Sequence, residues 1–319
     1  MTTRVLAAAR SAPGRVALVT CAIAGVALIL RRLGIEDVGR ALAGAAPYFP
    51  LIVVLEAGVL TCTMCGLRSL YGEAGAGVPL RQYVRAGLVG YALMGLVPAG
   101  RTVAEGARAS MLARWVGAGR AGAAAARLQA AALIANAAIS IPATIAVLVV
   151  IGPTWLALAI AINAAVTLVL GLSLLAIGRR ARVGAWLGRR IARAKEFGAE
   201  LDAAFEREPF LPWRAIGWEL CGRVVQVAQN AVLIAIVGGA FSIASALCSE
   251  SVHLVGAAVG DLIPAQLGAT ESNYTLAAHA LGLPGASAVS IALLAHLAQL
   301  VWVVVGSLVP LVWRAPAEV

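Results

Sequence analysis

Residues 88–105 read LVGYALMGLVPAGRTVAE, and residues 254–271 repeat the pattern as LVGAAVGDLIPAQLGATE. Every residue of the second stretch lies 166 positions after its counterpart, and eight of the eighteen pairs are identical. Apolar sequence gives chance matches of Leu, Val and Ala, but this ungapped alignment also pairs a Gly, a Glu, and Pro98 with Pro264. Apolar segments interrupted at matching places in two halves of a chain are typical of transporters built from internal repeats. We therefore expect two copies of one unit, each with a broken helix.

The composition places the chain in a membrane. Of its 319 residues, 61% are hydrophobic and 13% are charged, and a soluble protein of this length needs more polar residues to cover its core. The formal net charge of +10 would suggest nucleic acid in a soluble protein, but the Arg residues cluster between apolar runs and no nucleic-acid motif is present. We interpret the clusters as cytoplasmic loops that face anionic head groups, and we expect no nucleic-acid partner. The five Cys lie in or beside apolar runs, so we expect packing roles, no metal and no cofactor.

The apolar runs predict an all-α integral membrane protein with about six full transmembrane helices and two re-entrant helical hairpins in an inverted repeat. Residues 84–98 would reach only about 22 Å as a helix, against roughly 30 Å of hydrocarbon. The helix after them carries charge, so we expect each hairpin to enter and leave the membrane on one side. We expect a single membrane domain, 1–319. Its expected parts are spans at 16–30, 48–66, 120–151, 154–177, 214–237 and 286–312; an interfacial helix at 33–46; a first repeat, 48–151, with hairpin 84–116; a cytoplasmic amphipathic helix in the linker 179–213; and a second repeat, 214–312, with hairpin 244–280.

The distribution of Arg predicts the orientation. No Lys or Arg lies between Arg223 and Arg314, whereas residues 68–85 and 179–214 are basic. By the positive-inside rule, the basic regions are cytoplasmic and the mouth of the second hairpin faces outward. We therefore expect both termini on the cytoplasmic side of the cell membrane. The two copies then run in opposite directions, which is the geometry that permits alternating access.

Charged side chains inside apolar segments mark the candidate site, because a charge is costly to place in a membrane. The two breaks are expected at Pro98 and Pro264, and the matched acids Glu105 and Glu271 follow them. We expect these two carboxylates to bind a head group or to couple movement to protons. The alternative for both is an ion pair that only holds helices together.

Cationic and amide side chains complete the predicted head-group site. Arg101 and Arg108 flank the first break, and guanidinium groups can hold a phosphate in bidentate fashion. Asn273 follows the second break and joins this set. For the two Arg residues, the alternative is charge at the cytoplasmic edge of the membrane.

A further set of charges can serve as coupling groups or as structural ion pairs. Glu219 can pair with Arg223 one helical turn later, and Arg127 can meet one of the buried acids. The spacing of the three His residues fits no metal site, so we expect packing or interfacial roles for them. The coupling or structural set is Glu56, Arg127, Glu219, Arg223 and Asp261.

The chain resembles the membrane domain of lysylphosphatidylglycerol synthase/flippase proteins along nearly its whole length. The similarity lies in three places: Arg68 after the second span; Pro98, Arg101, Glu105 and Arg108; and Pro264, Gly268 and Glu271. In relatives, Gly-Glu-x-x-Arg usually comes directly after Pro-x-x-x, whereas here the first motif reads Pro-Ala-Gly-Arg-Thr-Val-Ala-Glu-Gly-Ala-Arg. The resemblance implies movement of phospholipid-like or polyprenyl-linked lipids between leaflets. We expect a stand-alone member without the soluble synthase domain.

These observations predict a lipid flippase that works by alternating access and whose partners are membrane lipids. No hydrolase, ATPase or transferase motif is present, so we expect no enzymatic activity. Two alternatives stay open. One is a membrane enzyme whose carboxylates act as acid and base on a lipid head group. The other is an accessory subunit that binds an envelope-lipid biosynthetic enzyme through 179–214. The sequence does not select the lipid, the direction of transport, the energy source or the oligomeric state.

Overall fold

The computed structural model describes residues 20, 36, 43–97, 100–260, 266 and 269–313, and every regular element in these residues is a helix. The expected span 16–30 and most of the interfacial helix 33–46 lie outside the described residues, apart from residues 20, 36 and 43–46. The same holds for Pro98, Asp261 and Pro264. The described helices are α4 (Phe49–Ser69), the 3-10 helix η1 (Gly72–Gly75), α5 (Leu80–Leu96), α6 (Gly100–Val116), α7 (Ala118–Val150), α8 (Trp155–Arg180), α9 (Val183–Arg190), the 3-10 helix η2 (Ala192–Ala194), α10 (Lys195–Arg207), α11 (Trp213–Ile236), α12 (Ile243–Gly260), α13 (Ala269–Ala277) and α14 (Gly285–Val312).

Five of the described helices are long and apolar enough to cross a membrane: α4, α7, α8, α11 and α14. Large apolar side chains on their outer surfaces are exposed, for example Leu158, Val149 and Val169, which are 62%, 79% and 61% exposed. An exposed apolar surface of this kind suits contact with lipid. The protein is therefore an all-α, multi-pass membrane protein.

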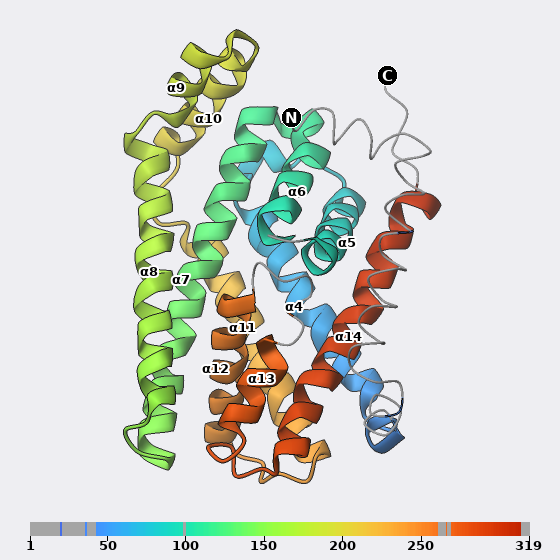
Figure 1. Cartoon of the computed structure of the whole chain (residues 1–319). Coiled ribbons are helices and arrows are strands. Elements are labelled where there is room, and N and C mark those ends of the chain that lie inside the picture. The colour runs from blue at the N-terminus through green and yellow to red at the C-terminus, as the bar shows by residue number, and fades with distance from the viewer. Residues whose placement is uncertain are drawn as a thin grey trace.

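Helices of the first copy correspond to helices of the second when their residue numbers are shifted by 166, the separation of residues 88–105 and 254–271. Adding 166 to the bounds of α4 gives 215–235, which falls within α11, and the same shift makes α5, α6 and α7 overlap α12, α13 and α14. Packing follows this correspondence: α5 packs against α14, and its counterpart α12 packs against α7. The two leading helices, α4 and α11, pack against each other. Figure 1 shows α5 and α6 near one end of the bundle, and α12 and α13 toward the other.

Two apolar clusters lie on either side of the middle of the bundle. One joins α4, α5, α6 and α7 and contains Leu67, Tyr83 and Leu112, which are at most 1% exposed. The other joins the opposite ends of α4 and α7 to α8, α11, α12, α13 and α14, and contains Ile52 and Ile291. Polar side chains gather between these clusters.

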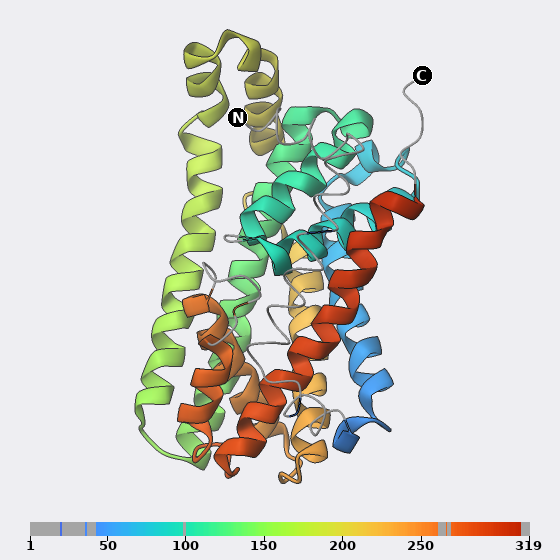
Figure 2. The same ribbon diagram turned by 45° about the vertical axis from the view of Figure 1, so that its right-hand side comes forward.

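The linker 179–213 contains two α-helices, α9 and α10, with the 3-10 helix η2 between them, where one amphipathic helix is expected from the sequence. They pack closely because Gly184 and Gly198 touch, and a Cβ atom on either would overlap the backbone of the other. The Asp202 carboxylate also accepts hydrogen bonds from the backbone N–H groups of Gly184 and Ala185, each at 2.8 Å. Figure 2 shows this helical pair projecting beyond the end of α8.

Candidate functional site

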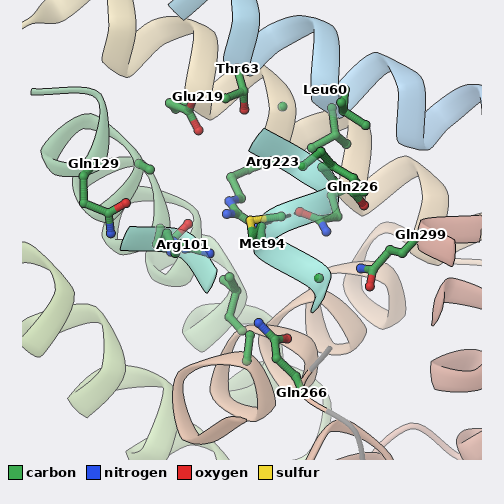
Figure 3. Close-up of a pocket in the computed structure, with 18 of the residues that line it drawn as sticks. Leu60, Thr63, Met94, Arg101, Gln129, Glu219, Arg223, Gln226, Gln266 and Gln299 are labelled. Carbon is green, nitrogen blue, oxygen red and sulfur yellow. Dashed lines mark hydrogen bonds between the residues drawn. The ribbon is translucent and has the colours of Figure 1, made fainter. Parts of the chain in front are cut away.

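A cavity of about 410 Å³ lies in the middle of the bundle. Its walls come from α4, α5, α6, α7, α8, α11, α12 and α14, together with Gln266. Both copies of the repeated unit therefore contribute to it, and so does α8. Figure 3 shows labelled side chains from several of these helices converging on this space. The ionisable groups that line it are Glu56, Glu105, Glu219, Arg101, Arg108, Arg223, His253 and His296.

Three Arg side chains make the cavity a candidate anion site. Arg101 and Arg108 come from α6, and Arg223 comes from α11, at positions far apart in the sequence. The Arg108 side chain is buried and its Nε atom has no hydrogen-bond partner among the described residues. Figure 3 shows Arg101 and Arg223 near the centre of the cavity. Guanidinium groups in such a setting suit a phosphate group.

The two acids related by the repeat both have a basic neighbour. In the first copy, Arg108 donates a hydrogen bond to Glu105 Oε1 from the same helix. In the second copy, Glu271 Oε1 lies 3.0 Å from Nδ1 of His296 on α14. Glu105 lines the cavity directly, whereas Glu271 lies behind the cavity-lining His296. Both acids therefore lie at the central cavity or directly behind its lining. The basic neighbour of Glu105 comes from the same helix, and that of Glu271 comes from another helix.

Glu56 belongs to a buried network between α4, α5 and α11. Tyr91 donates a hydrogen bond to one carboxylate oxygen, and Gln229 Nε2 donates to the other at 3.0 Å. Gln229 also donates to the backbone carbonyl of Ile52 at 3.2 Å. Glu56 is only 3% exposed, and these donors compensate for the loss of water around its carboxylate.

Arg223 contacts Glu250, whereas the sequence suggested Glu219 as its possible partner. Its Nη1 atom lies 3.5 Å from Glu250 Oε1 on α12 and donates to Gln226 Oε1 at 2.6 Å. Asn230 Nδ2 donates to the other oxygen of Glu250 at 2.9 Å. No ion pair joins Arg223 to Glu219 in the described part of the chain, and Glu219 instead lies beside Thr63 in Figure 3. The helical spacing of Glu219 and Arg223 thus did not decide the pairing, because α12 supplies a nearer carboxylate.

Two predicted site residues lie away from the central cavity. Arg127 donates from Nη2 to the carbonyl of Pro209 at 2.9 Å and meets neither Glu56 nor Glu219. It lines a second cavity, of about 600 Å³, between η1, α7 and α10. Asn273 donates to the carbonyl of Val252, so it joins α13 to α12 instead of facing the cavity. Tyr71 borders the second cavity, and burial raises the pKa of its phenol above the ordinary value, so the hydroxyl keeps its proton.

Several cavity residues were missing from the sequence prediction. His253 and His296 line the cavity, whereas His279 is exposed, so two of the three His residues converge. Glu250 is fully buried behind Arg223. A carboxylate inside an apolar run was the available signal for Glu250. No comparable signal identified the cavity-lining amides, which are Gln129, Asn136, Asn163, Gln226, Gln266 and Gln299.

The fold and the site define a class of protein: a helical membrane protein with a charged polar cavity in its interior. The sequence model of the family described as "Lysylphosphatidylglycerol synthase TM region" matches residues 14–306. The chain therefore belongs to this family of lipid-related membrane proteins. Comparison with curated proteins and with solved structures gives no match.

Proposed function

We propose that this protein moves a phospholipid-like or polyprenyl-linked lipid between the leaflets of the cell membrane. The observation that carries the proposal is the central cavity, which combines three Arg side chains with several carboxylates inside an apolar helix bundle. Pockets for small molecules and head groups have volumes of about 300–1,000 Å³, and the volume here is about 410 Å³. A lipid head group would occupy this space while its acyl chains remain in the bilayer.

The proposed fold has six spans, with residues 16–30 as the first, and two re-entrant hairpins in an inverted repeat. Three observations support it: the overlap of the helices of the two copies after a shift of 166 residues, the exchanged packing partners of α5 and α12, and the position of α5–α6 and α12–α13 toward opposite ends of the bundle. Helices α5 and α6 have 17 residues each, about 25 Å of helix, which is less than the hydrocarbon thickness. The proposed repeats are residues 48–151 and 214–312, and both termini are cytoplasmic.

In the proposed mechanism, Arg101 and Arg108 bind the lipid phosphate. Glu105 and Glu271 change partners or protonation as the hairpins alternate, because each carboxylate already has a basic neighbour that a bound phosphate can recruit. Two copies related by inversion can exchange conformations, which would open the cavity to one side and then to the other. Energy would come from an ion gradient or from the unequal distribution of the lipid, since the sequence has no nucleotide-binding motif.

Reconstitution tests this proposal directly. Purified protein in proteoliposomes should move labelled phospholipid between leaflets, and Glu105→Gln combined with Glu271→Gln should slow the movement at least about tenfold, the effect expected from losing about 1.4 kcal/mol of coupling. Glu196→Gln on exposed α10 provides a matched control. Unchanged rates in the double variant would exclude this mechanism. Mass spectrometry of the recovered lipids should find them chemically unaltered, and a new product would favour a membrane enzyme.

A further inference from the structure

The amide side chains of the central cavity bear on which head group it binds. Six Gln and Asn side chains line it, and they come from α7, α8, α11 and α14 and from Gln266. Figure 3 shows Gln129, Gln226, Gln266 and Gln299 distributed around Arg101 and Arg223. An amide offers both hydrogen-bond donors and acceptors. A group of amides beside guanidinium groups therefore matches a ligand that carries hydroxyl groups next to a phosphate.

Most of these amides have hydrogen-bonding capacity left for a ligand. Within the described chain, the side chains of Gln129, Asn163 and Gln299 make no hydrogen bond to protein, nor does that of Gln266. The buried Oδ1 atom of Asn136 also has no partner there. Buried polar groups are normally satisfied, and an unsatisfied one is costly. This argument applies to the buried Asn136, while the half-buried Gln129, Asn163, Gln266 and Gln299 present their free donors and acceptors to polar groups of a ligand or of water in the cavity.

The carboxylates, in contrast, are mostly engaged by the protein. Glu56 accepts hydrogen bonds from Tyr91 and Gln229. Glu105 pairs with Arg108, Glu250 with Arg223 and Asn230, and Glu271 with His296. Among the described residues that line the cavity, Glu105 Oε2 and Glu219 Oε1 are buried and accept no hydrogen bond. Basic side chains of the protein thus already accompany Glu105, Glu250 and Glu271, whereas most of the amides that line the cavity remain available to the hydroxyl groups of a ligand.

We infer that the cavity selects lipids whose phosphate carries a polyhydroxylated group, such as a sugar or a cyclitol, over lipids that end in an amine. This inference rests on the proposed function, because it names the class of lipid for the same site. The Arg side chains would bind the phosphodiester. Gln129 on α7 and Gln299 on α14 would bind hydroxyl groups from two sides of the cavity.

Native mass spectrometry of the full-length protein with lipids of matched acyl chains tests the inference. Phosphatidylinositol represents the polyol class, phosphatidic acid the phosphate alone, and phosphatidylethanolamine the amine class. We expect phosphatidylinositol to bind at least about tenfold more tightly than phosphatidylethanolamine, which corresponds to one or two additional hydrogen bonds. Equal or tighter binding of phosphatidylethanolamine would overturn the inference.

Substitution of the amide side chains provides a second test of the inference. Gln129→Met with Gln299→Met keeps the side-chain length but removes both amides. This double variant should weaken the binding of phosphatidylinositol about tenfold and change the affinity for phosphatidic acid by no more than about twofold. An equal loss for both lipids would contradict the assigned role. Leu158→Met with Leu276→Met, at exposed positions outside the cavity, controls for the introduced Met residues.

Two further measurements separate the possible failures. Soluble inositol 1-phosphate should compete only weakly, and competition as strong as that of the lipid would show that the site binds a free phosphate compound, which overturns the inference. Leaflet movement is then measured in proteoliposomes with the same lipids. Movement without head-group preference would refute the inference and leave the proposed function standing. Selective binding of phosphatidylinositol without any movement would support the inference about the ligand and refute the proposed function.

Discussion

Glu271 Oε1 lies 3.0 Å from His296 Nδ1, in a contact that joins α13 to α14 and is largely buried. Its counterpart in the first copy is Glu105, whose neighbour is Arg108 on the same helix. The repeat therefore keeps the acid but changes the base and the element that supplies it. An Arg guanidinium offers five hydrogen-bond donors in a fixed fork, whereas an imidazole ring offers at most two. The two halves of the site are thus chemically unequal.

The Glu271 and His296 pair should be energetically coupled. Glu271→Gln and His296→Gln should each lower stability by about 1–3 kcal/mol, because each removes one partner of a close and largely buried contact. The double variant should lose less than the sum of the two single losses. Thermal unfolding in detergent, followed by tryptophan fluorescence, measures this cycle against Glu196→Gln. Additive losses would show that the contact contributes nothing.

Tyr91 should be needed to keep Glu56 buried. Tyr91→Phe removes one donor from a carboxylate that is only 3% exposed, and we expect a loss of about 1–3 kcal/mol. Tyr48→Phe, at a position 54% exposed, is the matched control. The midpoint of thermal unfolding should fall for Tyr91→Phe and stay unchanged for Tyr48→Phe. Equal midpoints would mean that Gln229 suffices to satisfy Glu56.

Gly90 and its repeat counterpart Gly256 should permit close packing between the helices of the two proposed hairpins. A Cβ at Gly90 would overlap the Arg108 side chain, and a Cβ at Gly256 would lie 3.1 Å from the Thr270 Cα atom. Gly90→Ala should cost about 1–3 kcal/mol through overpacking, and Gly256→Ala should cost less.

The control for this pair is Gly106→Ala on α6, where a Cβ meets nothing within 4 Å. It should be neutral or stabilise the helix by up to about 1 kcal/mol. The three variants can be ranked by unfolding midpoint in one detergent. Destabilisation by Gly106→Ala as large as that by Gly90→Ala would indicate a general effect of removing glycine and argue against close packing within the hairpin.

The mouths of the two hairpins should be reached from opposite sides of the membrane. Gly77 precedes α5 and Gly285 begins α14, and a Cβ at either position meets nothing within 4 Å. In a cysteine-free background, an impermeant maleimide should label Gly77→Cys only from the cytoplasm and Gly285→Cys only from outside. Labelling of both from one compartment would refute the inverted repeat.

Much of the fold could be predicted because the signals are local. The five described spans follow apolar runs whose hydropathy is set by neighbouring residues, and α5 and α6 occupy the predicted stretch 84–116. The two-helix form of the linker could not be predicted in this way. It depends on the contact between Gly184 and Gly198, which lie on successive α-helices and become neighbours only when α9 folds onto α10.

The candidate site was predictable only in part. Arg101, Glu105 and Arg108 line the cavity, and their position near a predicted helix break had already identified them as candidate site residues. Arg127 was equally marked by its charge, but it faces the second cavity. Charge inside an apolar run shows that a residue needs a partner. It does not show on which face of the helix that partner lies.

The order of residues is enough to identify this chain as a helical membrane protein and to show that residues 88–105 and 254–271 correspond, because hydropathy and alignment need no other information. The tertiary structure decided that Arg223 contacts Glu250 at 3.5 Å and that His296 lies beside Glu271. These choices depend on which helices become neighbours and on how each is rotated about its axis. Such rotations are fixed by packing across the whole bundle, for which a local stretch of sequence carries no signal.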